Sequence, residues 1–112
     1  MIGRLALDVV NMQILEIDPE VDFQVIAGTK RSQAAIMVLD PQSSTGGPNN
    51  KHAHSDQWLF VTSGNGTAIV AGDEVPLKVN SLLLIEAGET HEIKNTGDKP
   101  LKTLNFYCPA QY

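Results

Sequence analysis

Residues 46–64 read GGPNNKHAHSDQWLFVTSG and place two histidines just before an apolar segment. The apolar residues 58–62 predict a strand, and the turn-forming residues 63–66 end it. Side chains two positions apart on a strand point to the same face, so we expect His52 and His54 to share a face. Two imidazoles placed in this way can converge on one metal ion.

The rest of the chain also reads as short strands separated by turns, with little helix. Only residues 4–15 can hold a short helix, and Gly72-Asp73 predicts a two-residue hairpin turn. Residues 34–39 and 82–85 are continuously apolar and are expected to be buried strands. This pattern predicts an antiparallel sandwich or barrel, a class that includes jelly rolls. The expected strands are residues 21–25, 34–39, 58–62, 67–71, 74–79, 82–85, 91–93 and 103–108.

Length and charge restrict the classes of protein to which the chain can belong. Its 112 residues suit a single domain, and eight Lys and Arg against thirteen Asp and Glu leave a net charge of −5. An acidic surface repels nucleic acid, and the longest apolar run, residues 82–85, is too short to span a membrane. A single cysteine, Cys108, suits a reducing compartment, and no signal peptide is recognised, so we expect a cytoplasmic protein.

A third histidine, His91, begins a later predicted strand and can supply a third metal ligand. The alternative is that the three histidines are solvated loop residues or hydrogen-bonded core imidazoles. Aromatic residues at strand spacing, which more often belong to the core, can also line a pocket. These aromatic residues are Trp58, Phe60, Phe106 and Tyr107.

The spacing of these residues resembles the two motifs of the cupin superfamily. The first motif, G-x5-H-x-H-x3,4-E-x6-G, is matched over residues 46–64, with Gln57 in place of the Glu and a gap of two residues before it. The second motif, G-x5-P-x-G-x2-H-x3-N, is matched over residues 80–95. Here Asn80 and Glu86 replace a Gly and a Pro, which shape the backbone and bind no metal.

The resemblance implies an all-β cupin jelly-roll barrel, also called a double-stranded β-helix, as one domain over residues 1–112. It also implies a divalent transition metal (Fe, Zn, Mn or Ni) bound by His52, His54, Gln57 and His91. A neutral Gln ligand leaves the ion its full charge and makes it a stronger Lewis acid, whereas Gln57→Glu should tighten metal binding. Alternatively, Gln57 only hydrogen-bonds a neighbour and the pocket holds no metal.

Three functions remain open, because the cupin fold hosts all of them. The first is a metal-dependent dioxygenase acting on a small organic substrate. The second is a metal-dependent isomerase or lyase of sugar-like substrates, and the third is a non-catalytic module that binds a small ligand. The resemblance also implies a homodimer, with residues 5–26 as the candidate pairing segment.

Overall fold

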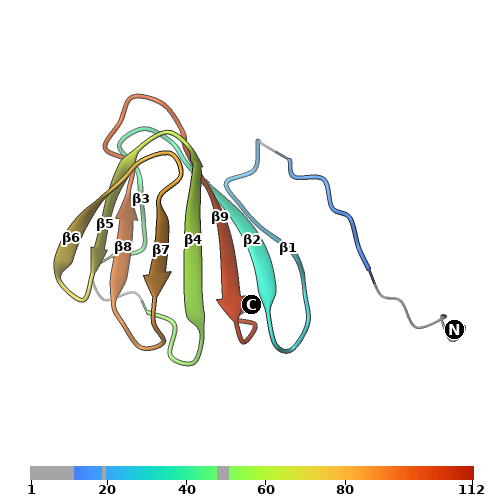
Figure 1. Cartoon of the computed structure of the whole chain (residues 1–112). Coiled ribbons are helices and arrows are strands. Elements are labelled where there is room, and N and C mark those ends of the chain that lie inside the picture. Colours follow the sequence, from blue (N-terminus) through green and yellow to red (C-terminus); the bar gives the residue numbers. More distant parts are fainter. Residues whose placement is uncertain (1–11, 19, 48–50) are drawn as a thin grey trace, which may run out of the picture.

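The computed structural model describes residues 12–18, 20–47 and 51–112, and it contains nine strands and no helix within these ranges (Figure 1). The predicted helix over residues 4–15 lies largely outside the described ranges, and its described part, residues 12–15, is not helical. The strands are β1 (Phe23–Gly28), β2 (Gln33–Leu39), β3 (Ser44–Thr45), β4 (Asp56–Ser63), β5 (Gly66–Val70), β6 (Asp73–Leu77), β7 (Leu82–Ile85), β8 (His91–Lys94) and β9 (Leu101–Cys108).

The strands form two sheets whose neighbours are mostly distant in the sequence. The first sheet has the order β1-β2-β9-β4-β7 and the second has the order β3-β8-β5-β6. Every pair of neighbouring strands is antiparallel. The chain thus crosses repeatedly between two facing sheets, which confirms the predicted all-β jelly roll.

Inward and outward side chains alternate along the strands, and the inward side chains of the two sheets form the core between them. Along β9 the buried positions are 101, 103, 105 and 107, and along β4 they are 57, 59 and 61. The buried apolar cluster consists of Met37, Leu39, Leu59, Val61, Ala68, Leu77, Ile85, Ile93 and Leu101.

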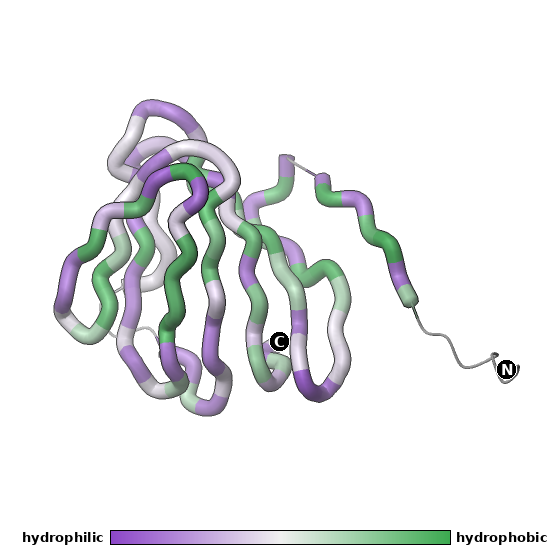
Figure 2. The backbone as a smooth tube through the Cα atoms, in the orientation of Figure 1, coloured by the Kyte–Doolittle hydropathy of each residue, from purple (hydrophilic) through white to green (hydrophobic). Residues whose placement is uncertain are grey.

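The continuously apolar strand β7 differs from its prediction as a fully buried strand. Figure 2 shows it as apolar along its length, yet Leu82 and Leu84 are 61% and 39% exposed. Strand β7 is the edge of the five-stranded sheet, and its alternate side chains point out of the barrel. The prediction for β2 is closer, since five of its seven residues are buried.

Two local features were predicted imperfectly. The turn between β5 and β6 is formed by Ala71 and Gly72, not by Gly72 and Asp73, since Val70 pairs with Asp73. Both turn residues have positive φ, 50° and 87°, as a type I′ hairpin turn requires. Strand β3 lies in a segment where the sequence predicts no strand, and only its pairing with β8 identifies it as a strand.

Asn80 stands where the second motif has a glycine, and its backbone conformation explains why Asn fits there. Asn80 has a φ of 74°, a left-handed conformation that Asn tolerates better than most residues other than Gly. Gly64 at the end of the first motif has a φ of 83°, and a Cβ there would overlap the carbonyl oxygen of Pro100. The replacement of Gly by Asn at position 80 therefore preserves the turn that the motif requires.

Asn95, the last residue of the second motif, has a structural role. Its side chain is 1% exposed, and its Nδ2 donates to the carbonyl oxygens of Leu39 and Lys99 at 2.9 and 2.7 Å. Its Oδ1 accepts a hydrogen bond of 2.9 Å from the Gly97 amide. Asn95 thus ties the loop before β9 to the end of β2.

Within the described ranges, the structure has no helix of the length and apolar character that crossing a membrane requires.

Candidate metal centre

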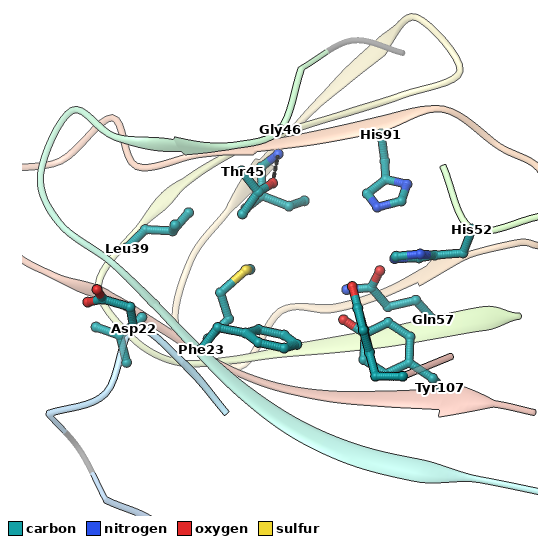
Figure 3. A pocket seen from close by; sticks show the side chains of 13 residues that line it. Asp22, Phe23, Leu39, Thr45, Gly46, His52, Gln57, His91 and Tyr107 are labelled. Carbon is teal, nitrogen blue, oxygen red and sulfur yellow. Dashed lines mark hydrogen bonds between the residues drawn. The ribbon is translucent and has the colours of Figure 1, made fainter. Parts of the chain in front are cut away.

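A cavity of about 390 Å³ lies within the barrel and contains three of the four predicted site residues (Figure 3). The three are His52, Gln57 and His91. They come from the segment before β4, from β4 itself and from the start of β8, so both sheets contribute. The other lining residues are Asp22, Phe23, Met37, Val38, Leu39, Thr45, Gly46, Ile93, Tyr107 and Tyr112.

The imidazoles of His52 and His91 lie close together, with ring centroids 4.8 Å apart. Both side chains are buried, with exposed fractions of 8% and 3%. Backbone contacts hold the two segments side by side, because the His52 carbonyl accepts a 2.7 Å hydrogen bond from the Gly88 amide. The two rings therefore lie in contact although His52 and His91 are 39 positions apart in the sequence.

Burial keeps both imidazoles neutral near pH 7. It lowers the pKa of His52 below the usual 6.5, the nearby His91 lowers it further, and the adjacent Gln57 side chain opposes the shift without reversing it. Burial also lowers the pKa of His91, although a backbone hydrogen bond with Glu89 opposes this shift. Since a metal ligand must present an unprotonated nitrogen, both rings are in the protonation state that binds metal.

The ring of His91 is oriented by the turn that precedes β8. Its Nδ1 lies 3.3 Å from the carbonyl oxygen of Glu89. A carbonyl oxygen only accepts, so this contact places the proton on Nδ1 and the lone pair on Nε2. A histidine that ligates a metal typically donates its other ring N–H to a group of this kind.

Gln57 carries a buried oxygen that no donor satisfies. Its side chain is 3% exposed, and its Oε1 has no hydrogen-bond partner among the described residues. Its Nε2 donates a 2.9 Å hydrogen bond to Oδ1 of Asn105 on β9. An orphaned buried oxygen is costly, and a cation bound beside the two imidazoles would remove the cost. The residues present therefore fit a divalent metal ion.

His54 is placed differently from the prediction. Its side chain is exposed and does not line the cavity, so the structure brings together two imidazoles and not three. The expectation assumed an extended strand, but residues 53 and 54 form a bend, and β4 begins only at Asp56. In a bend, the rule that alternate side chains share a face does not apply. Across the described ranges, no three His, Cys, Asp or Glu residues are grouped as metal ligands.

Aromatic side chains form one wall of the cavity. Tyr107 and Tyr112 pack edge-to-face with centroids 5.2 Å apart, and His52 packs against Tyr107 at the same distance. Burial, and then the neighbouring Tyr112, raise the pKa of Tyr107, so its hydroxyl stays protonated at neutral pH. Of the aromatic residues expected near a pocket, only Tyr107 lines this cavity, because Trp58 and Phe106 occupy outward positions.

Tyr112 is a cavity residue that the sequence analysis missed. Its backbone N–H and C=O are bound by the side chain of Gln33, at 2.8 Å in both directions. This clamp turns residue 112 back toward the cavity, where its ring also meets Phe23 at 5.2 Å. No local sequence pattern predicts these hydrogen bonds, because Gln33 and Tyr112 lie 79 positions apart.

Comparison with known proteins agrees with the fold and with the motif spacing. The Cupin domain family matches residues 35–107. An oxalate-binding protein of Thermotoga maritima is 34% identical over 70 residues, which are 62% of this chain and 56% of that protein. The chain therefore spans little more than half the length of this curated relative.

Solved structures give the same result. A protein from Bacillus halodurans has a TM-score of 0.76 and 26% identity, with 81% of this chain and 72% of that chain covered. A predicted oxalate decarboxylase from Thermotoga maritima has a TM-score of 0.71 and 27% identity, with 79% of each chain covered.

Proposed function

Because the chain belongs to the cupin family, we propose that it is a metal-binding small cupin in which His52, Gln57 and His91 hold a divalent transition metal. The unsatisfied, buried Oε1 of Gln57 beside two neutral imidazoles carries this proposal. Nitrogen and oxygen donors of this kind suit Fe, Zn, Mn and Ni. When bound, such an ion supplies Lewis acidity or, if it is redox-active, oxygen chemistry.

His54 enters the proposal as a fourth ligand that turns inward when metal binds. It lies two residues after His52, in a bend that belongs to no strand. Reorientation of this side chain therefore breaks no ladder hydrogen bond. We expect His54→Ala to weaken metal binding less than His52→Ala or His91→Ala, because the ordering of His54 offsets part of its contribution.

The lining of the cavity favours an uncharged organic substrate over a phosphorylated sugar. Among the described lining residues, Asp22 is the only one with a carboxylate, and none is Lys or Arg. A phosphate group ordinarily needs cationic side chains or a helix N-terminus, and this lining offers neither. We therefore propose a dioxygenase acting on a small, largely apolar substrate, in preference to an isomerase or lyase of sugar phosphates.

The chain's own residues would serve this reaction in three ways. The apolar side chains of Phe23, Met37 and Ile93 exclude water from the substrate. The protonated hydroxyl of Tyr107 is a hydrogen-bond donor for an oxygen atom of the substrate. The Gln57 amide and the two imidazoles contribute no net charge, so they leave the charge of the ion undiminished.

Non-catalytic ligand binding is the second candidate, and the name of the oxalate-binding relative favours it. Oxalate is a dianion, and within the described lining no cationic side chain is present to receive it. Oxalate binding by this chain should therefore require the metal. Calorimetry with oxalate, before and after chelation, separates this candidate from metal-independent binding.

The test of the metal site begins with elemental analysis of protein purified without chelators. Calorimetric titration with Mn²⁺ should then give at least about 10-fold weaker binding for His52→Ala, His91→Ala and Gln57→Leu. Gln42→Leu is the matched control for the last variant, because Gln42 is exposed and does not line the cavity. Wild-type protein that binds no divalent metal would refute the proposal.

Oxygen consumption distinguishes the reaction classes. Protein loaded with Fe²⁺ should consume oxygen in the presence of an apolar substrate, and Zn²⁺ should abolish this consumption because zinc has no redox chemistry. Equal turnover with both ions would instead support an isomerase or lyase. No turnover with either ion, together with metal-dependent oxalate binding, would support the binding module.

We further propose that two copies pair through the outer face of the five-stranded sheet. Trp58 pairs in register with Leu84 and Phe106, and these outward side chains are 39%, 39% and 41% exposed. A contiguous apolar patch of this kind marks an interaction surface. The candidate segment, residues 5–26, contributes further exposed apolar side chains in its described part, namely Met12, Ile14, Leu15 and Ile17.

Light scattering at micromolar concentration should return twice the 12.1 kDa mass of the chain. Trp58→Lys should return the monomer mass. Val75→Lys is the control, since Val75 is 37% exposed but belongs to β6 of the other sheet. A wild-type mass near that of one chain would contradict the dimer.

A further inference from the structure

A chain of buried side-chain hydrogen bonds runs from Gln57 across three neighbouring strands. Nε2 of Gln57 on β4 donates to Oδ1 of Asn105 at 2.9 Å. Nδ2 of Asn105 donates to Oγ1 of Thr103 at 3.0 Å, and that hydroxyl donates to the carbonyl oxygen of Met37 on β2 at 3.0 Å. The Gln57, Asn105 and Thr103 side chains are 3%, 0% and 3% exposed, so water does not compete.

The direction of every bond follows from the last member of the chain. The Met37 carbonyl can only accept, so the single hydroxyl hydrogen of Thr103 must point toward it. The Thr103 oxygen can then only accept from Asn105, which must present its Nδ2 on that side and its Oδ1 on the other. That oxygen accepts a hydrogen bond from Nε2 of Gln57, and Oε1 of Gln57, which has no partner of its own, is left on the side of the cavity (Figure 3).

We propose that Thr103 and Asn105 are positioning residues that lock the Gln57 amide with its oxygen toward the cavity. Neither residue lines the cavity, so neither can be a ligand or touch a substrate. A reversed Gln57 amide would place its oxygen against Oδ1 of Asn105 and turn two donors toward the ion site. The role of this orientation in metal binding rests on the proposed function, whereas the orientation itself exists without metal.

Strand register explains why these residues meet. Asn105 pairs with Leu59, and Thr103 pairs with both Val61 and Met37, so β9 lies between β4 and β2. Thr103, Asn105 and Tyr107 alternate on the inward face of β9. The same face thus presents one aromatic wall residue and, next to it, the two polar residues that orient Gln57.

The test replaces Thr103 by Val, which has nearly the same shape but lacks the hydroxyl that fixes the direction of the hydrogen bonds. Thr103→Val should weaken Co²⁺ binding about 10-fold and change the visible spectrum of bound Co²⁺. Thr103→Ser keeps the hydroxyl and should retain both properties. Thr62→Val is the matched control, because the Thr62 hydroxyl also donates to a β9 carbonyl, that of Lys102 at 3.1 Å, but is exposed.

A second measurement reads the orientation in metal-free protein. The side-chain NH₂ protons of Gln57 should exchange slowly with solvent in wild type, Thr103→Ser and Thr62→Val, and at least about 10-fold faster in Thr103→Val, which loses the bond that directs the chain. Unchanged exchange in Thr103→Val would overturn the proposed lock. Faster exchange with unchanged Co²⁺ affinity would overturn its role toward the metal. If wild type binds no Co²⁺, the metal centre fails, and the exchange rates alone decide whether Thr103 and Asn105 orient Gln57.

Discussion

Gln57 and Asn105, 48 positions apart in the sequence, are joined by a buried hydrogen bond of 2.9 Å from Nε2 to Oδ1. The bond requires a donor at position 57, which Gln provides and an ionised Glu does not. It thereby explains why an amide stands where the cupin motif has a carboxylate. The same amide keeps an oxygen for the cavity.

This contact changes the expectation for Gln57→Glu. Charge alone predicts tighter metal binding, but the introduced carboxylate would face the Asn105 oxygen. We expect the metal-free variant to lose about 1–3 kcal/mol of unfolding free energy at pH 7. Urea denaturation of wild type and variant measures this difference.

The loss should shrink as the pH falls, because a protonated carboxyl can donate to Asn105 as the amide does. The carboxyl pKa is raised in the folded state, so the variant keeps its stability below the usual Glu value of about 4.3 and loses it as pH rises. Gln42→Glu is the control, since Gln42 is exposed and donates to the Gly97 carbonyl at 3.1 Å. Equal effects of the two substitutions would contradict the explanation.

Acid should destabilise the metal-free protein through His52 and His91. Burial lowers the pKa of both below 6.5, so below that pH the unfolded chain takes up protons before the folded one. Both residues are neutral in both states above that range, where they add no pH dependence. Urea unfolding between about pH 7.5 and 5 should show falling stability, and a double variant, His52→Gln with His91→Gln, should flatten the slope.

Asn95→Ala should destabilise the fold by about 2–4 kcal/mol, although Asn95 itself does not line the cavity. The substitution leaves the carbonyl oxygens of Leu39 and Lys99 without their donor. Chemical denaturation measures the loss. Ser43→Ala, which removes a single exposed bond to the Asp40 carbonyl, should cost less than about 1 kcal/mol. A loss for Asn95→Ala as small as that of the control would refute the structural role.

Ala71→Asn should stabilise the protein by about 0.5–1 kcal/mol. Ala71 has a φ of 50° in the turn between β5 and β6, and the following Gly72 completes the Asn-Gly pair that type I′ turns prefer. Thermal unfolding of the variant tests this expectation. Ala87→Asn is a control in an exposed turn where φ is not positive, and its midpoint should not rise.

The sequence by itself determined the class of fold and three residues of the candidate site. Alternating or continuously apolar runs, with turn residues between them, are local properties of the sequence, and they located eight of the nine described strands. Motif spacing placed His52, His91 and Gln57 together because each is held by a short segment at a known distance from a turn. Only β3 was not predicted, because a strand of two residues is too short to show a pattern.

Only the tertiary structure determined which residues each side chain contacts. The bond between Gln57 and Asn105 depends on the register of β4 with β9, and the place of Tyr112 depends on its clamp by Gln33. The outward position of His54 depends on a bend that replaces the expected strand. Such contacts join residues far apart in the chain or depend on where pairing begins, and no local sequence pattern encodes either property.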